Sequence, residues 1–237
     1  MTFRRGVTSG LAIGLGYLSV SFSFGIMAVN SGLTWWQAVL ISITNLTSAG
    51  QVAGVGIMAS GGSPVEMAVT QLVINLRYSL MAISLSQKTD SSMTVPARLM
   101  SSYIITDEIF GLASTEEKVC FKYMMGLGVL PVAGWTLGTF LGAIMGNVLP
   151  AFVAASLAIG IYGMFVAIVL PVCRKSKTIS IICIISVVLA IIFRYVPFLY
   201  ANVSSGFAII ICAVISAVIG VFITPESELS EEAEDGQ

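Results

Sequence analysis

The chain has 237 residues, of which 57% are apolar and 10% are charged, with 11 Lys or Arg and 12 Asp or Glu. A soluble domain usually has about 25% charged residues, so this sequence cannot cover a water-exposed surface. The composition excludes a soluble enzyme, a secreted domain and, because no basic face exists, a nucleic-acid-binding protein. With no histidine and four widely spaced cysteines, the sequence predicts no metal site, no disulfide framework, no cofactor and no catalytic group.

Eight apolar stretches are long enough to cross about 30 Å of hydrocarbon, which takes about 20 helical residues. We therefore expect an all-α integral membrane protein. It has eight transmembrane helices if the charged fourth stretch crosses, and seven if that stretch stays outside. Eight spans with a cytoplasmic N-terminus place seven Lys or Arg inside and three outside, Lys88 and Arg98 among the latter, so the positive-inside rule favours eight. The predicted spans are 7–29, 35–59, 64–85, 96–113, 123–146, 152–173, 179–196 and 206–223.

The sequence divides into a membrane domain, residues 1–224, and a tail, residues 225–237, that has six acids and no base. Such a tail is predicted to be disordered, and eight spans place it in the cytoplasm. A shift of 118 residues aligns 3–27 with 121–145 and predicts a duplication, with repeats at 1–117 and 118–224. Glycines spaced by four in both stretches predict close helix packing, with a hinge as the alternative. The identical pairs are Phe3 and Phe121, Gly10 and Gly128, Gly16 and Gly134, Phe22 and Phe140, Ile26 and Ile144, and Met27 and Met145.

The second predicted span contains a run, residues 44–54, that is too polar and too rich in glycine for a helix facing lipid. Gly50 and Gly54 weaken the helix there, and Asn45 and Gln51 need hydrogen-bond partners. A broken helix at mid-membrane exposes backbone groups to a substrate, so this run is a candidate substrate-binding break. The alternative is a tight helix crossing with interhelical hydrogen bonds. The candidate substrate ligands in the run are Asn45, Thr47, Ser48, Gly50 and Gln51.

Arg77, Asp107 and Glu108 are predicted to lie deep in the membrane, where an ionised group is costly enough to indicate function. On continuous helices, Arg77 lies about 20 Å from the inner face and Asp107 about 14 Å from it. The two groups can therefore pair, or they can hold the carboxylate and the ammonium of a zwitterion. Adjacent helical residues point about 100° apart, so one acid pairs with Arg77 while the other faces a cavity and binds a proton. A purely structural ion pair is the alternative.

Several motifs follow one another along the chain: Phe3-Arg4-Arg5-Gly6, Gly16-Tyr17, Phe22-Ser23-Phe24-Gly25, Ser48-Ala49-Gly50-Gln51-Val52-Ala53, Asn75-Leu76-Arg77-Tyr78, Thr106-Asp107-Glu108-Ile109-Phe110 and Trp135-x-x-Gly138-Thr139-x-x-Gly142-x-x-x-Gly146. Together these segments resemble the AzlC-type branched-chain amino acid permeases of bacteria, with matches in order from the N-terminus to about Pro171. One position departs from the pattern: a His often follows the arginine in the family, and this chain has Tyr78. If that His carries protons, this chain couples differently or has another substrate.

The resemblance implies an exporter of leucine, isoleucine, valine, methionine or related hydrophobic amino acids in the bacterial cytoplasmic (inner) membrane. It makes Asn75-Leu76-Arg77 and Thr106-Asp107-Glu108 family features, which adds Asn75 to the candidate ligands. Members commonly work with a small AzlD-type membrane subunit; a homo-oligomer is the alternative. Because the chain has no GxxxxGK[ST] motif, we expect proton-driven secondary transport, coupled through Asp107 and Glu108. A scaffold subunit, or a transporter of another small zwitterion, is the alternative.

Overall fold

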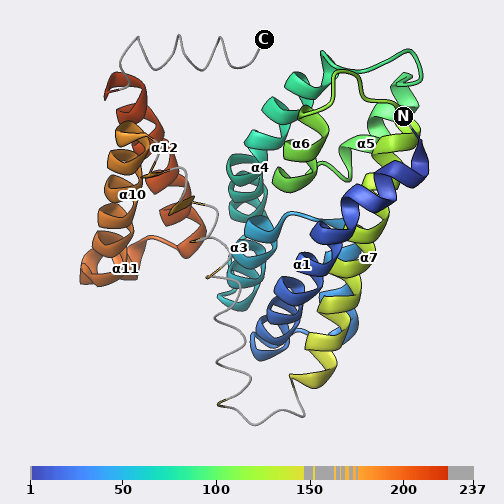
Figure 1. Ribbon diagram of the computed structural model, residues 1–237. Helices are drawn as coiled ribbons and strands as arrows, with labels where there is room; N and C mark the ends of the chain where they lie inside the picture. Colours follow the sequence, from blue (N-terminus) through green and yellow to red (C-terminus); the bar gives the residue numbers. More distant parts are fainter. Residues whose placement is uncertain are drawn as a thin grey trace. The chain divides into compact units, whose positions relative to one another are not determined.

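The computed structural model describes residues 2–146, 152, 163, 166, 169, 170, 173, 174 and 176–223. In these residues the regular structure is helical, apart from one isolated β-bridge between Thr89 and Val119. Five of the described helices, α1, α4, α7, α10 and α12, are long and apolar enough to cross a membrane, which agrees with an all-α integral membrane protein. The predicted tail and most of the predicted span 152–173 lie outside the described residues. The helices are α1 (Phe3–Asn30), α2 (Trp35–Thr44), α3 (Ser48–Ala59), α4 (Pro64–Ser86), α5 (Val95–Ser102), α6 (Asp107–Ser114), α7 (Phe121–Met145), α10 (Lys177–Tyr195), α11 (Pro197–Asn202) and α12 (Ser205–Ile223) (Figure 1).

The chain forms two compact units. Unit 1 contains Met1–Ser60 and Ile74–Gly163, and unit 2 contains Gly61–Val73 and Met164–Gln237. Helix α4 contributes its first half to unit 2 and its second half to unit 1. In unit 2, α10 packs on α12: the Ser186 and Ser216 hydroxyls lie 2.7 Å apart, and Ile182 lies against Gly220. The exposed side chains of these two helices are mostly apolar, as expected for lipid-facing helices.

Helices α1 and α7 form the centre of unit 1 and pack against each other along their length. The predicted glycine stripes meet here. A methyl group on Gly6 would lie 2.3 Å from the Tyr123 carbonyl oxygen, and one on Gly142 would lie 2.0 Å from the Phe22 carbonyl oxygen. Only glycine permits such a close backbone approach. Because contacts advance in the same direction along both helices, α1 and α7 run parallel, and we call the end where both begin the N-terminal end of unit 1.

The predicted span 35–59 is two helices rather than one. Helix α2 ends at Thr44 and α3 begins at Ser48, so the break that the polar run predicted lies at residues 45–47. The chain also reverses there: Gln51 Nε2 donates to Ser42 Oγ at 3.2 Å, although a continuous helix would separate these residues by about 13 Å. In Figure 1, α2 and α3 diverge from this break as the two arms of a hairpin. Trp35, at the start of α2, packs on Phe140 near the end of α7, so the hairpin starts from the end opposite the N-terminal end.

The predicted span 96–113 is also a hairpin, of α5 and α6 joined by residues 103–106. Both of its outer ends lie at the N-terminal end of unit 1. Arg98, on α5, donates to Thr89 Oγ1 at 3.0 Å, and Lys88 Nζ donates to the Ser114 carbonyl oxygen at the end of α6 at 2.7 Å. Eight crossings would put the linkers around Lys88 and Lys118 on opposite faces. Val119 N–H donates to the Lys88 carbonyl oxygen at 2.7 Å, so the fourth stretch does not cross, as in the alternative of seven spans.

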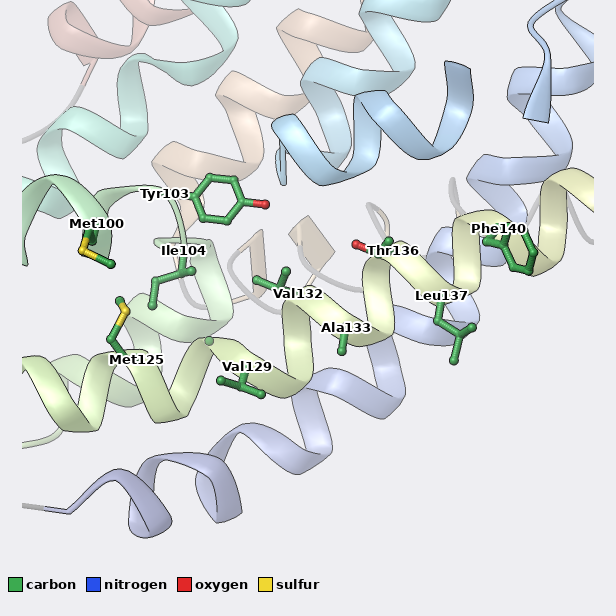
Figure 2. Close-up of a pocket in the computed structure, with 11 residues that line it drawn as sticks. Met100, Tyr103, Ile104, Met125, Val129, Val132, Ala133, Thr136, Leu137 and Phe140 are labelled. Carbon is green, nitrogen blue, oxygen red and sulfur yellow. The ribbon is translucent and has the colours of Figure 1, made fainter. Parts of the chain in front are cut away.

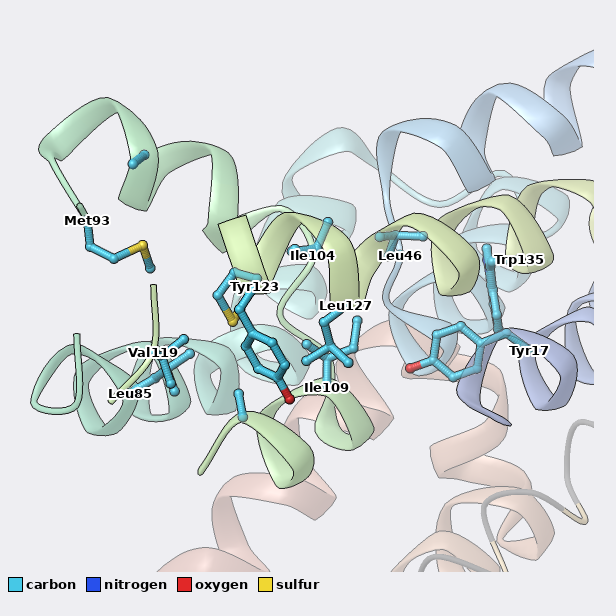
Figure 3. Close-up of a cluster of buried hydrophobic side chains, with 13 residues drawn as sticks. Tyr17, Leu46, Leu85, Met93, Ile104, Ile109, Val119, Tyr123, Leu127 and Trp135 are labelled. Carbon is cyan, nitrogen blue, oxygen red and sulfur yellow. The ribbon is translucent and has the colours of Figure 1, made fainter. Parts of the chain in front are cut away.

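The two hairpins enter unit 1 from opposite ends and meet inside it. The Tyr103 hydroxyl, at the tip of the α5–α6 hairpin, donates to the Ile43 carbonyl oxygen in the last turn of α2. Apolar side chains from both tips join the core: Leu46 comes from the first hairpin, and Ile104 and Ile109 come from the second (Figure 3). Burial of these side chains against α7 fixes the depth at which the two breaks stand. Among the described residues, α1 and α7 are the full-length spans that lie wholly in unit 1, and α4 is shared with unit 2.

Candidate functional site

Arg77 and Asp107 form an ion pair at the tip of the α5–α6 hairpin. Arg77 Nη1 lies 2.6 Å from Asp107 Oδ2, and the side chains are 39% and 27% exposed. The guanidinium also donates to the Tyr78 hydroxyl at 3.3 Å and stands 5.0 Å from the centre of that ring. The pairing that the sequence predicted is therefore present. The continuous helix assumed for Asp107 is not, because Asp107 is the first residue of α6.

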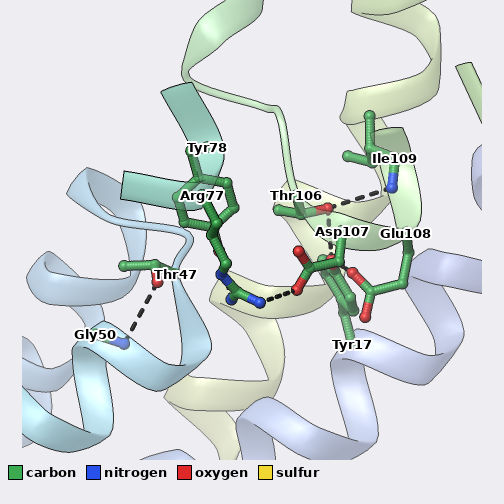
Figure 4. A network of polar contacts seen from close by, with 9 residues as sticks. All are labelled: Tyr17, Thr47, Gly50, Arg77, Tyr78, Thr106, Asp107, Glu108 and Ile109. Atoms are coloured by element: carbon green, nitrogen blue, oxygen red, sulfur yellow. Dashed lines mark hydrogen bonds and ion pairs between the residues drawn. The ribbon is translucent and has the colours of Figure 1, made fainter. Parts of the chain in front are cut away.

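Glu108 has a different partner, so the two acids diverge as the 100° step between neighbours predicted; that Glu108 faces a cavity stays a prediction. The Tyr17 hydroxyl oxygen, from the middle of α1, lies 2.5 Å from Glu108 Oε2 and 2.7 Å from Thr106 Oγ1 (Figure 4). A carboxylate can only accept, so Tyr17 donates to Glu108 and Thr106 donates to Tyr17. Thr106 Oγ1 also accepts the Ile109 N–H at 3.4 Å and so caps α6. This chain of hydrogen bonds attaches the hairpin tip to α1.

The α2–α3 break has its own buried polar network. Trp135 Nε1, on α7, donates to Gln51 Oε1 at 2.9 Å, and the Ser42 and Thr139 hydroxyls lie 2.7 Å apart. Gln51, Ser42 and Thr139 are all almost fully buried. Each group has a partner, so the network holds the hairpin against α7 at little cost. This geometry fits the alternative of interhelical hydrogen bonds, and it leaves the backbone of residues 45–47 outside any helix.

Both breaks place a helix N-terminus inside unit 1. Thr47 Oγ1 accepts the Gly50 N–H at 3.3 Å at the start of α3, as Thr106 does for α6. Asn45 Oδ1 accepts the Thr47 N–H at 3.3 Å, which stabilises the turn between the helices. Helix N-termini carry partial positive charge. At α6 this charge favours the carboxylates of Asp107 and Glu108 in the first turn, and Asp107 also pairs with Arg77.

The predicted site residues are thus only partly gathered. Arg77, Asp107 and Glu108 lie together, and Figure 4 places Thr47 and Gly50 in the same region. Asn75 lies two residues before Arg77, about 200° around α4, and so faces another direction. The sequence interpretation gave no polar role to four side chains, although Tyr17, Trp135 and Thr139 stand in the family motifs, because a single aromatic or hydroxyl residue in an apolar helix does not reveal its partner. They are Tyr17, Ser42, Trp135 and Thr139.

An apolar groove of about 830 Å³ lies beside the hairpin tip (Figure 2). Tyr103 and Ile104 line it from the tip, and Met125, Val129 and Val132 line it from α7. It contains no charged side chain. A groove of this composition accepts an aliphatic group rather than a polar one.

Long apolar helices, two hairpins that enter from opposite ends and an ion pair at depth define a multi-pass α-helical membrane protein. The AzlC protein family matches residues 12–149, more than half of the chain, and the chain belongs to this family. The inner membrane protein YgaZ of Escherichia coli K12 is 26% identical over 165 residues, 67% of each chain.

Other relatives are named only as membrane proteins. One from Archaeoglobus fulgidus is 27% identical over 173 residues, 71% of this chain and 75% of that one. One from Helicobacter pylori strain 26695 is 23% identical over 149 residues, 61% of this chain and 64% of that one. No solved structure matches the chain. The matched region contains both hairpins, Arg77 and Tyr17.

Proposed function

We propose that the protein is a secondary transporter that exports branched-chain or other hydrophobic neutral amino acids across the bacterial cytoplasmic membrane. The observation that carries this proposal is the meeting of two hairpins from opposite ends, with the Arg77–Asp107 pair at the tip of one of them. In this proposal each end of unit 1 contributes one hairpin to a central site, and the hairpins are the elements that move. A scaffold needs packing alone, whereas alternating access needs a site that either side can open.

The substrate binds between Arg77 and Asp107 and replaces their direct contact. Its carboxylate takes the Arg77 guanidinium, aided by the helix N-termini, and its ammonium takes the Asp107 carboxylate. A zwitterion is the ligand that leaves neither partner of the pair uncompensated. The aliphatic side chain lies toward the apolar groove beside Tyr103 and Ile104. Asn45, Thr47, Ser48, Gly50 and Gln51 supply polar groups at the other tip, and Asn75 belongs to the proposed set through its family motif.

Proton coupling involves Asp107 and Glu108. The Tyr17 hydroxyl donates to Glu108 at 2.5 Å, and a hydrogen bond to an ionised acceptor is about twice as strong as a neutral one. A proton on Glu108 therefore weakens the attachment of the α5–α6 hairpin to α1. A proton on Asp107 similarly weakens its hold on Arg77. Proton entry thus favours opening of this hairpin, which couples the gradient to access.

The charge distribution supports the orientation. Of the seven Lys and Arg in the described part of unit 1, all but Arg77 lie at its N-terminal end. The positive-inside rule places this end, and the N-terminus, in the cytoplasm. The proposal also includes a cytoplasmic acidic tail at 225–237, two repeats at 1–117 and 118–224, and association with a small AzlD-type subunit or a second copy of the chain. The two hairpins, at 35–59 and 96–113, replace two of the eight membrane crossings that the sequence predicted.

A structural role is the second candidate, because the direct 2.6 Å contact between Arg77 and Asp107 would also hold α4 and α6 together. Counterflow in liposomes separates the two. The full chain is reconstituted with and without a small partner subunit and tested with labelled leucine, isoleucine, valine and methionine at two pH values. We expect exchange of at least one of them, faster with an inward-directed proton gradient. No exchange of any of them contradicts the amino-acid proposal, and a rate independent of pH contradicts proton coupling.

A further inference from the structure

A third acid, Glu66, is buried in unit 2. It lies in the first turn of α4, and only 3% of its surface is exposed. Glu66 Oε1 accepts the Gly206 N–H at 2.9 Å and also the Ser204 hydroxyl, so it binds the N-terminus of α12. Among the described residues no Lys or Arg forms an ion pair with it. A carboxylate with such burial is costly unless its partners stabilise the charged form.

Thr70 lies one turn further along α4, on the same face. It is fully buried, and its hydroxyl has no hydrogen-bond partner among the described residues. A methyl group on Gly206 would lie 2.5 Å from Glu66 Oε1 and 2.8 Å from Thr70 Oγ1, so both oxygens border the same small space. An unsatisfied buried hydroxyl is rare in folded proteins and needs an explanation.

We propose that Glu66 is a proton-binding site with two alternative sets of partners. In the ionised form, its oxygens accept the Ser204 O–H and the Gly206 N–H, with further support from the helix N-terminus. In the protonated form, the carboxyl O–H donates to Thr70 Oγ1, which gives the unpaired hydroxyl its partner. The proton comes from water and returns to it, and no other bond changes. Protonation therefore loosens the hold of α4 on α12.

In the described part of unit 2, few other charged or titratable groups could affect the protonation of Glu66. Helix α12 has no charged residue. Arg194, in the last turn of α10, stands over the Tyr200 ring at 5.0 Å from its centre. Besides Glu66, the titratable groups among the described residues of unit 2 are Cys173, Arg174, Lys177, Cys183, Arg194, Tyr195, Tyr200 and Cys212, and none is within hydrogen-bond distance of Glu66. The site therefore depends on Thr70, Ser204 and the α12 backbone.

Infrared difference titration of the full chain in lipid nanodiscs tests this site without any transport assay. The spectrum of the wild type minus that of Glu66→Gln cancels the other carboxyls. Gln keeps an acceptor for Ser204 and Gly206 and offers an N–H to Thr70, so this variant should fold. We expect one protonated-carboxyl band that appears as the pH falls. A difference spectrum with no titrating band overturns the proposal and makes Glu66 a fixed cap of α12.

Two further variants should move the titration midpoint in opposite directions. Thr70→Val removes the acceptor of the protonated form and should lower the midpoint by about one pH unit, tenfold in proton affinity. Ser204→Ala removes a donor to the ionised form and should raise it by a similar amount. Thr70→Ser keeps the hydroxyl and should titrate like the wild type. A Thr70→Val midpoint equal to that of the wild type overturns the role given to Thr70. Failure of amino-acid exchange leaves all these outcomes unaffected.

Discussion

Gln51 and Ser42, nine residues apart, are joined by a 3.2 Å hydrogen bond across the break between α2 and α3. The same Gln51 accepts from Trp135 on α7 at 2.9 Å. One amide thus closes the hairpin and attaches it to the central helix pair. The reversal matters for function because it turns a stretch of membrane-crossing length into an element that enters and leaves on one side.

The first prediction concerns this topology. Residues 87–94 and 115–120 should lie on the same face of the membrane, because Val119 N–H donates to the Lys88 carbonyl oxygen at 2.7 Å. In a variant without native cysteines, Ser91→Cys and Glu117→Cys should react with a membrane-impermeant maleimide from the same side. Ser60→Cys, exposed just before the start of α4, should react from the opposite side. Labelling of Ser91→Cys and Glu117→Cys from different sides would contradict the hairpin and show that residues 96–113 cross the membrane.

The second prediction concerns the ion pair. Arg77→Ala leaves the Asp107 carboxylate without its cation in a partly buried site, so we expect export to fall at least tenfold while the protein still inserts. Arg77→Lys keeps the charge but loses the planar fork and should retain part of the activity. Export is measured in vesicles and divided by the amount of inserted protein. Unchanged export by inserted Arg77→Ala would remove Arg77 from the mechanism.

The charge-swapped double variant, Arg77→Asp with Asp107→Arg, separates the two roles of the pair. It restores the attraction but reverses the polarity that the substrate meets. Recovery of assembly without recovery of transport supports a substrate-binding role. Recovery of both supports a structural pair.

The third prediction concerns helix packing. Gly25→Ala places a methyl group 2.2 Å from the Thr139 carbonyl oxygen and should destabilise the protein by about 1–3 kcal/mol. Gly16, on the same helix, has nothing within 4 Å of the added methyl group, so Gly16→Ala should be neutral or stabilising by up to about 1 kcal/mol. Thermal unfolding in detergent compares the two. Equal melting temperatures would contradict the close contact between α1 and α7.

The sequence predicted the ion pair because charge is so rare in this chain that a charged residue inside an apolar stretch stands out. It predicted a break in the polar run 44–54 but neither reversal of the chain, because a stretch of 25 or 18 apolar residues has the length of a crossing whether or not it turns back. The available signals were Thr47 and Thr106, hydroxyl residues that cap new helices. Glu66 was missed because its position near a helix end suggests exposure, and only the contacts of α12 reveal its burial.

The last prediction concerns Tyr17. Tyr17→Phe removes the hydroxyl that links Glu108 and Thr106 to α1, with little change in shape. It leaves both former partners short of a hydrogen bond, which costs about 1–3 kcal/mol for buried groups. We expect a lower melting temperature and, because Glu108 loses its donor, a changed pH dependence of exchange. Tyr195→Phe is the matched control, since Tyr195 is 78% exposed and should change neither quantity. If Tyr17→Phe alters stability but leaves the pH profile unchanged, the hydroxyl only attaches the hairpin, and Glu108 is not part of proton coupling.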